Sequence, residues 1–292
     1  MLNTAIKPHI LQPSTVVPKG DFLHQLKQDG HRTLLHYDNG KISVYTRNKN
    51  NVSSKYIELQ NIKLPVDNCI LDGELICFDL ESETEQPIPC FDSLQIRFQT
   101  SNPDKIKSLS NTLPVMFSAF DIIFLNGESL INKPLSFRFE KLQTLITNEQ
   151  YISLCPTFSD GEALFEKVVE LGMEGVCSKS LSGLYQLNAR PTAKSNDVWY
   201  KIKNYQYETV QIGAIRKKEF GWMMLQEGKY KGILEFVPPD ERKAFYLISK
   251  QLKRDEDKNY IYIDPLIQCE VKYQCLSKKG LMRSPSFVKF IV

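Results

Sequence analysis

The chain has 292 residues, of which 42% are hydrophobic and 24% are charged, and its formal net charge at pH 7 is +3. This composition is typical of a soluble globular protein and excludes an intrinsically disordered chain. No run of about 18 apolar residues is present, and the N-terminus lacks the apolar core of a secretion signal, so we expect a cytoplasmic protein that does not contact membranes.

Strand patterns dominate the first third of the chain. Thr33–Tyr37 and Ile42–Tyr45 are β-rich runs that flank an Asn-Gly pair, and this arrangement predicts a tight hairpin. A further strand is predicted over Cys69–Phe78, where a polar Asp-Gly-Glu interrupts the apolar run. Pro114–Leu125 is apolar enough for a buried strand and ends at another Asn-Gly pair.

The middle of the chain alternates predicted loops with two predicted helices. Residues 80–90 and 99–112 are polar and contain Pro and Ser, which indicates loops. Leu135–Ile146 and Asp160–Leu171 carry apolar side chains at helical spacing, and Asp160 is a suitable cap for the second helix. Strands and helices together predict an α+β fold for this part of the chain.

The pattern changes after Lys203. Short strands with Gly punctuation follow, and they predict a small all-β barrel. Residues 1–203 hold 21 Lys and Arg against 23 Asp and Glu, whereas residues 204–292 hold 16 against 11. An ordinary protein surface explains this difference, and a basic domain that faces phosphates is the alternative. We therefore predict two domains, 1–203 and 204–292.

The cysteines and histidines give no sign of a structural metal. The seven cysteines are scattered and never spaced as C-x-x-C, and the four histidines all lie near the N-terminus. Reduced thiols in a cytosolic protein explain this pattern better than disulfides or a zinc site.

The segment from Lys27 to Arg32, Lys-Gln-Asp-Gly-His-Arg, is the strongest chemical signal. A lysine attacks phosphorus only as the neutral amine, so we expect the surroundings to lower the pKa of Lys27. Gly30 allows backbone to approach a ligand closely, and Arg32 can hold phosphate by two parallel hydrogen bonds. In isolation, a charged turn is the usual structure of such a sequence.

Further motifs follow in a fixed order, and together they decide the interpretation. The segments are Lys27–Arg32, Tyr45–Asn48, Asp72–Glu74, Phe120–Asp121, Glu174–Lys179 and Trp199–Lys203. The set resembles the covalent nucleotidyltransferase superfamily of DNA ligases, RNA ligases and mRNA-capping enzymes. Smaller agreements resemble ATP-dependent DNA ligases of the minimal bacterial and phage type, and they are Phe91–Arg97, Pro134–Arg138, Tyr185 with Arg190, and Glu270–Phe287.

The resemblance implies both a fold and an activity. The implied fold is a nucleotidyltransferase domain of ATP-grasp-like antiparallel sheets with helices, followed by an OB-fold barrel that binds DNA. The implied activity is sealing of nicks in double-stranded DNA by a monomeric enzyme that uses ATP and Mg²⁺. In that reaction Lys27 carries AMP and passes it to the 5′-phosphate of the nick, and the 3′-hydroxyl then displaces AMP.

The resemblance also assigns the remaining site residues. The residues expected to bind ATP are Gln25, Arg32, Arg47, Glu74, Phe120, Lys201 and Lys203. Phe120 is expected to stack on the adenine, and Lys201 and Lys203 have the period-2 spacing that puts both on one strand face. Glu74 and Glu174 are expected to bind the metal, because a carboxylate in an apolar run is costly unless a cation compensates it.

The sequence departs from the family pattern at two places. Many of these ligases have Glu two residues before the lysine, a position that helps to recognise the base, whereas this chain has Gln25. The basic C-terminal motif is not clearly present, and Arg283 or the pair Lys278-Lys279 is the candidate to orient pyrophosphate in its place.

Three other functions fit parts of the pattern. A capping guanylyltransferase usually has Asp-Gly where this chain has Glu174-Gly175, and many RNA ligases lack an aspartate at position 29. A non-catalytic nucleic-acid-binding relative is the third alternative, and the intact lysines and glutamates of the motifs disfavour it.

Overall fold

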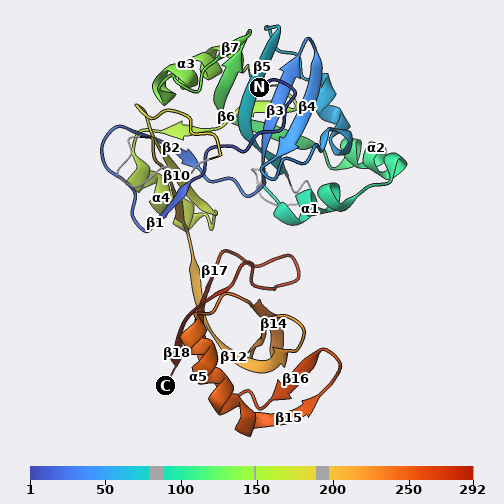
Figure 1. Ribbon diagram of the computed structural model, residues 1–292, viewed down its shortest axis with the longest axis vertical. Coiled ribbons are helices and arrows are strands. Elements are labelled where there is room, and N and C mark those ends of the chain that lie inside the picture. The colour runs from blue at the N-terminus through green and yellow to red at the C-terminus, as the bar shows by residue number, and fades with distance from the viewer. Residues whose placement is uncertain (79–88, 148, 189–196, 292) are drawn as a thin grey trace. The chain divides into compact units, whose positions relative to one another are not determined.

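The computed structural model describes residues 1–78, 89–147, 149–188 and 197–291, and it divides the chain into two compact units (Figure 1). Unit 1 is Met1–Lys203 and unit 2 is Asn204–Val292. Within the described ranges, no helix is both long and apolar enough to span a bilayer.

The larger sheet of unit 1 has the strand order β4-β3-β5-β6-β7, with β8 parallel to β6. Its strands are β3 (His31–Asp38), β4 (Lys41–Thr46), β5 (Asn68–Cys77), β6 (Val115–Leu125), β7 (Glu128–Ser129) and β8 (Ile152–Leu154). The predicted hairpin is confirmed as β3 and β4, which pair antiparallel. The predicted strands over 69–78 and 114–125 are confirmed as β5 and β6.

The smaller sheet of unit 1 has the strand order β1-β11-β10-β2-β9. Its strands are β1 (Gln12–Ser14), β2 (Phe22–Leu26), β9 (Thr157–Phe158), β10 (Gly175–Ser180) and β11 (Trp199–Lys203). All neighbours pair antiparallel except β1 and β11, which are parallel. The sheet therefore brings Lys27, which directly follows β2, next to motif residues more than 140 positions away.

Helices cover both sheets of unit 1. They are α1 (Phe91–Gln99), α2 (Pro103–Thr112), α3 (Leu135–Leu145) and α4 (Gly161–Glu170), with 3-10 turns at Ser53–Lys55 and Ile57–Asn61. The main core packs α3 against the large sheet, with Leu71, Phe117 and Leu142 fully buried between them. Both predicted helices, α3 and α4, are confirmed, and the Asp160 side chain caps α4 by accepting from the Ala163 N–H.

The predicted loop over 99–112 is wrong, because most of it is helix α2. Asn102 caps that helix through its side chain, and Pro103 occupies the first turn, where no N–H is needed. Ile106 supplies the buried contact, so one apolar side chain on a polar helix was too weak a periodic signal. Most of the loop predicted over 80–90 lies outside the described residues.

Unit 2 is a seven-stranded antiparallel sheet with one α-helix. Its elements are β12 (Gln206–Arg216), β13 (Trp222–Gln226), β14 (Lys229–Leu234), α5 (Pro239–Ser249), a 3-10 turn (Lys250–Leu252), β15 (Lys253–Glu256), β16 (Tyr260–Ile263), β17 (Gln268–Tyr273) and β18 (Ser286–Ile291). The long strand β12 pairs with β13, β16 and β17, so it links the two parts of the sheet.

The prediction of an all-β second unit is wrong, because α5 belongs to its core. Phe245 of α5 is buried, and its ring centroid lies 4.0 Å from that of Trp222 in β13. Acidic residues occupy the first turn and proline the first position, which favours a helix start. Leu247 and Ile248 of the same helix are exposed, so the apolar side chains do not form the single stripe by which an amphipathic helix is recognised.

Candidate active site

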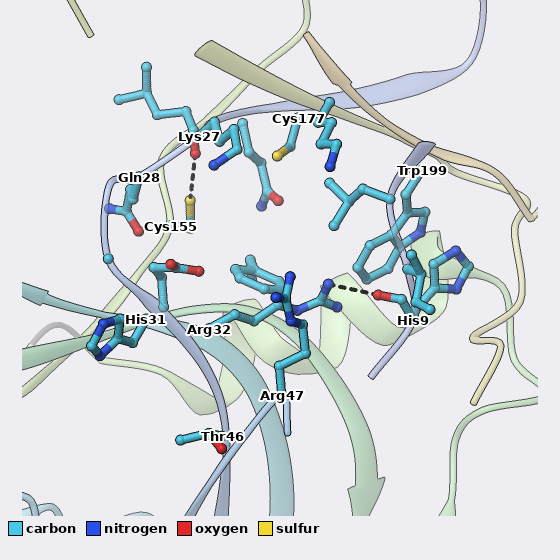
Figure 2. Close-up of a pocket in the computed structure, with 18 of the residues that line it drawn as sticks. His9, Lys27, Gln28, His31, Arg32, Thr46, Arg47, Cys155, Cys177 and Trp199 are labelled. Atoms are coloured by element: carbon cyan, nitrogen blue, oxygen red, sulfur yellow. Dashed lines mark hydrogen bonds between the residues drawn. The ribbon is translucent and has the colours of Figure 1, made fainter. Parts of the chain in front are cut away.

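A cavity of about 550 Å³ lies in unit 1 and is lined by both sheets (Figure 2). The structure brings most of the predicted site residues to its walls, namely Gln25, Lys27, Arg32, Arg47, Glu74, Phe120, Lys201 and Lys203. Glu174 directly precedes β10 and binds one of these side chains, Lys27. In Figure 2, Lys27 and Cys177 lie on one side of the cavity, and Arg32, Thr46 and Arg47 lie on the other.

Strand alternation in the small sheet separates a face that packs on α4 from a face that lines the cavity. His24 and Ser178 are hydrogen-bonded at 2.8 Å on the α4 side, where the His24 ring lies against Gly161. The next residues, Gln25 and Cys177, are opposite each other in the register and line the cavity. Lys201 is opposite Cys177 on the other neighbouring strand, so the period of two places all three on one face.

Lys27 is held by carboxylates. Its Nζ donates a hydrogen bond to Oε1 of Glu174, and Nζ of Lys203 lies 3.8 Å from the same oxygen. Burial by itself lowers the pKa of Lys27, but Glu174, Cys177 and Glu74 raise it, and the net direction is upward. The predicted lowering of this pKa is therefore wrong, because the carboxylates beside the ammonium stabilise its charged form.

Glu74 is the second carboxylate beside Lys27. Burial raises its pKa to about 8, with a smaller opposing effect of Lys27 and a further increase from Glu174. Among the described residues, no hydrogen bond or ion pair to the Glu74 side chain is found. In the same part of the chain no group of three or more His, Cys, Asp or Glu side chains is arranged to hold a metal ion. The carboxyl groups beside Lys27 are thus Glu74 and Glu174, and Glu174 also lies 3.8 Å from Nζ of Lys203.

Three nitrogen atoms of the Arg32 guanidinium donate hydrogen bonds to protein groups. Its Nε and Nη2 donate to the two oxygens of Asp72 at 3.0 and 2.6 Å, and its Nη1 donates to the His9 carbonyl at 2.7 Å. Asp72 also accepts from the Tyr185 hydroxyl at 2.6 Å. The bidentate interaction predicted for Arg32 and a phosphate is thus made within the protein, to the buried carboxylate of Asp72.

Aromatic rings form one end of the cavity, where Figure 2 shows His9 and Trp199. Their rings stack with centroids 4.4 Å apart, and Trp199 meets Phe120 edge-to-face at 6.3 Å. Lys179, the last residue of the motif that starts at Glu174, places Nζ 3.7 Å from the Phe120 centroid and 4.3 Å from that of Trp199. Asp121, next to Phe120, is buried in a bidentate pair with Arg138.

Two glycines of the motifs are required by close contacts within the protein. A Cβ on Gly30 would clash with the carbonyl oxygen of Leu75 in β5. A Cβ on Gly175 would clash with the carbonyl oxygen of Ile202 in β11, and its φ of +154° is disfavoured for other residues. The sequence argument placed a ligand against Gly30, whereas the structure places a neighbouring strand there.

The lining of the cavity also includes Arg47 with Thr46, Asn48 and Asn50, and His31 with Phe91 and Phe98. His31 packs edge-to-face on both phenylalanines and contacts the Gln95 amide at 3.1 Å. The segment Phe91–Arg97, which resembles the ligase pattern, thus supplies part of the cavity wall through Phe91 of helix α1.

Several wall residues were not predicted as site residues. His9, Cys177 and Trp199 are among them, together with Lys179. The last three lie inside the recognised motifs, so their alternation with known motif positions could have identified them. His9 carries no sequence signal, because only the fold brings the N-terminal segment to β11. Arg190 lies outside the described residues, and Arg283, Lys278 and Lys279 belong to unit 2.

Comparison with known proteins gives one family. Residues 1–203 match the model described as the ATP dependent DNA ligase domain. The chain is 32% identical over 269 residues to the SPbeta prophage-derived DNA ligase-like protein LigB of Bacillus subtilis, covering 91% of this chain and 92% of that protein. It is 25% identical to the DNA ligase of Thermococcus fumicolans, covering 93% of this chain and 51% of that protein. The chain therefore spans about half the length of this second relative.

Solved structures with the same fold cover nearly the whole chain. One comes from a structure-function study of Lig E DNA ligases, with a TM-score of 0.67 and 16% identity over 98% of this chain and 99% of that one. Another is a mycobacterial DNA ligase D complexed with ATP and MES, with a TM-score of 0.58 and 22% identity over 98% of this chain and 95% of that one. At these identities the similarity establishes the fold, a combination of mixed sheets and helices.

Proposed function

This chain belongs to the ATP-dependent DNA ligase family, and on that premise we propose that it seals nicks in duplex DNA through AMP carried on Lys27. One observation carries the proposal: Lys27 lies in a cavity that also collects Gln25, Phe120, Lys201 and Lys203, and its ammonium is bound to Glu174. A nucleophile beside carboxylates, with further cations on the same face, suits attack on a phosphate.

The first step is an in-line displacement at the α-phosphate of ATP. The Lys27 ammonium loses a proton, its Nζ forms a bond to phosphorus, and the bond to the bridging oxygen of pyrophosphate breaks. Glu174 already accepts a hydrogen bond from Nζ and is placed to receive that proton. Lys201 and Lys203 lie on the same strand face and would stabilise the negative charge on phosphate oxygens.

The two later steps use the same groups. A 5′-phosphate oxygen of the nick attacks the phosphorus of lysyl-AMP, and the Lys27 nitrogen leaves. The 3′-hydroxyl then attacks the 5′-phosphate, the new phosphodiester forms, and AMP leaves. Each step keeps negative charge on non-bridging phosphate oxygens, so cationic side chains at fixed positions contribute throughout.

The remaining cavity residues are assigned either to the base of ATP or to its ribose and phosphates. We assign Phe120 and the buried amide of Gln25 to the base, and Arg47 to the ribose or phosphates; all three side chains line the cavity. Arg32 is expected to contact the nucleotide through the N–H groups that Asp72 and His9 leave unused, so its position is fixed before ATP binds.

Glu74 and Glu174 are the residues that would hold Mg²⁺. Oxygen ligands suit this ion, which commonly binds one or two carboxylates and takes its other ligands from phosphates and water. Burial, and to a smaller degree Glu174, raises the pKa of Glu74 to about 8, so a bound cation would stabilise the ionised form of this carboxyl group. When bound, the ion would neutralise phosphate oxygens and weaken the hold of Glu174 on Lys27.

The metal assignment is tested by Glu74→Ala and Glu174→Ala. Each variant should bind ATP but need more Mg²⁺ for lysine labelling and seal nicks more slowly. Wild-type sealing rates and an unchanged Mg²⁺ titration in both variants would remove these residues from the metal site.

We propose that unit 2 is an OB-fold that binds the nicked duplex. Its seven-stranded antiparallel sheet with the helix α5, and the 16 basic against 11 acidic residues of 204–292, support this role. Affinity for nicked DNA measured across a salt series should fall with a log–log slope of about −0.9 per phosphate contacted. Lys278→Gln with Lys279→Gln should make that slope shallower, and an unchanged slope would exclude this basic pair from the interface.

The decisive experiment incubates the purified chain with ATP, GTP or NAD⁺ labelled in the AMP or GMP portion. Covalent label from ATP alone, followed by its loss as nicked DNA is sealed, is the expected result. Label from GTP would indicate a capping-type enzyme, sealing of RNA but not DNA ends would indicate an RNA ligase, and no label would indicate a non-catalytic relative.

A further inference from the structure

Phe120 occupies an irregular position in strand β6. On the neighbouring strand β5, the consecutive residues Asp72 and Gly73 are opposite Asp121 and Ala119. Phe120 lies between the latter two and has no counterpart on β5. This is the register of a β-bulge, an insertion that redirects side chains and is common beside active sites. The ring that lines the cavity is therefore carried by the bulge residue itself.

The bulge changes which face of β6 each side chain occupies. Ala119 and Ile122 are three positions apart, so strict alternation would place them on opposite faces. Both nevertheless belong to the main core against α3. The two residues between them, Phe120 and Asp121, are not part of that core, and Phe120 instead meets Trp199 edge-to-face at 6.3 Å. The direction of the Phe120 ring thus depends on the conformation of the bulge.

The side chain of Asp121 is fixed by three donors. Nε and Nη2 of Arg138 donate to its two oxygens at 2.9 and 2.8 Å, and the Ile122 N–H donates to Oδ1 at 2.8 Å. Asp121 and Arg138 are fully buried. Asp121 is also directly opposite Asp72, and like charges opposite each other destabilise a sheet. The carboxylate beside Phe120 therefore requires a cation of its own, and Arg138 supplies it.

Arg138 is itself held in one place. Its Nη1 donates to the carbonyl oxygens of Lys133, before α3, and Gly183, after β10, at 2.6 and 3.2 Å. The guanidinium therefore joins two loop segments to the bulge of β6. Neither Arg138 nor Asp121 is among the residues that line the cavity, whereas Phe120 is. An effect of Arg138 on a bound nucleotide would therefore pass through Phe120.

We propose that Arg138 is a positioning residue for the nucleotide: its bidentate bonds to Asp121 fix the bulge that directs Phe120 to the base of ATP. This inference rests on the proposed function, in which Phe120 contacts the base. A lysine cannot replace Arg138 in this role, because an ammonium is a point charge and does not hold both carboxylate oxygens in one plane. Arg138→Lys thus keeps the charge balance but releases the orientation of the bulge.

The first test measures binding of α,β-methylene-ATP by calorimetry. The carbon bridge of this analogue prevents release of pyrophosphate, so binding is measured without labelling of Lys27. Arg138→Lys should weaken binding by about 10-fold, within the range expected for stacking of one base on an aromatic ring. The KM for ATP should rise to a similar degree, and the labelling rate at saturating ATP should fall by less than about threefold. Unchanged affinity in folded Arg138→Lys would overturn the proposal.

The second test is a double-mutant cycle with Phe120→Leu. That change should also weaken binding of the analogue by about 10-fold. The double variant should bind no more weakly than Phe120→Leu alone, because the direction of a ring that is absent has no effect. If Arg138 only supports the fold, the two effects should multiply to about 100-fold. A multiplicative result would overturn the proposal, because Arg138 would then act independently of Phe120.

Two further variants guard the result against a lost fold. Asp121→Asn keeps the shape of the side chain but loses one of its two bonds to Arg138, so it should weaken the analogue in the same way, and only when Phe120 is present. Arg254→Lys makes the matched change in an exposed ion pair with Asp264 and should alter neither affinity nor stability. Thermal unfolding of every variant shows which of them retain the fold.

The outcomes separate this inference from the proposed function. If ATP does not label the wild-type chain, the ligase function fails, and Arg138 has no nucleotide to position. If ATP labels Lys27 and Phe120→Leu binds the analogue as well as wild type, Phe120 does not contact the base and the role of Arg138 is wrong. If ATP labels Lys27 and the cycle is multiplicative, only the role of Arg138 is wrong.

Discussion

Two walls of one cavity are built in opposite ways. The paired wall, on the large sheet and its neighbours, presents Arg32 to the cavity and supports it with buried groups that satisfy one another: Asp72, Tyr185, Asp121 and Arg138. The ligand wall, on the small sheet, consists of Gln25, Lys27, Lys179, Lys201 and Lys203. Two members of the ligand wall have no hydrogen-bond partner among the described residues.

The difference separates stability from chemistry. A buried charge that loses its partner destabilises the fold by several kcal/mol, so changes in the paired wall should reduce stability first. The ligand wall retains groups whose desolvation is not compensated within the protein, and changes there should reduce activity first. The arrangement is that of a site which keeps unsatisfied groups for its substrate and fixes them with a satisfied scaffold.

The largest expected effect is on chemistry alone, in Lys27→Ala. Covalent labelling from ATP should fall by more than about 10,000-fold, as expected when a nucleophile is removed. Stability should change little, because Glu174 keeps a second cation, Lys203, at 3.8 Å. Mass spectrometry of the labelled chain and urea unfolding measure the two effects. Label retained on the variant would place the nucleophile at another residue.

The next effect is on stability, in Asp72→Asn. Arg32 would keep its position in the wall but lose its buried counter-charge, and unit 1 should be destabilised by about 3–5 kcal/mol. Asp240→Asn makes the same change in an exposed pair with Lys243 and should cost less than about 1 kcal/mol. Urea unfolding compares the two variants. Similar small losses in both would show that the paired wall does not hold the fold.

The aromatic end of the cavity should also give stability a pH dependence, through His9. Burial, followed by the charge of Arg32, lowers its pKa to about 3, so the folded state binds fewer protons than the unfolded state below pH 6.5. The contribution is present in full above pH 6.5 and is lost as the pH falls towards 3, by roughly 2 kcal/mol between pH 6.5 and 5.

His9→Gln isolates this contribution. The difference in unfolding free energy between wild type and variant, measured at pH 7 and pH 5, should change by about that amount. Both proteins contain every other titrating group, so these cancel in the difference. A difference that does not depend on pH would show that His9 takes up its proton without cost.

The smallest effect is expected for Tyr185→Phe. The change removes one donor from Asp72 but leaves the two bonds from Arg32, so the loss should be about 1.5 kcal/mol, with ATP labelling nearly unchanged. Tyr45→Phe removes a weaker bond of 3.2 Å to the Asn3 carbonyl and serves as the comparison. If Tyr185→Phe abolished labelling instead, stability and chemistry would not be separable between the walls.

The local features of the fold were predictable because short-range patterns carry them. The β3–β4 hairpin followed from its Asn-Gly turn, and α4 followed from its apolar spacing and its Asp160 cap. Helices α1, α2 and α5 were missed, because each has only a few buried residues and a mainly polar or irregular surface. Proline at the start of α2 and α5, and the Asn102 cap of α2, were present but were outweighed by the absence of a clear period.

The members of the site were predictable from motifs, but their electrostatics were not. The sequence indicated Lys27, Glu74 and Glu174 separately, and the structure shows that the two carboxylates raise the pKa of the lysine. Gly30 was assigned to a ligand, whereas its space is taken by the carbonyl of Leu75. Both errors concern neighbours that are distant in the sequence, which no local pattern identifies.

The sequence by itself determined the order of the motifs, the strand alternation and the residue types available for phosphate chemistry. Only the tertiary structure decided which of them satisfy one another. It joined Arg32 to Asp72, 40 positions away, and His9 to Trp199, and it left Gln25 and Lys179 facing the cavity without hydrogen-bond partners among the described residues. The reason is physical: burial cost and charge pairing depend on distances in space, which strand register fixes only when the sheets assemble.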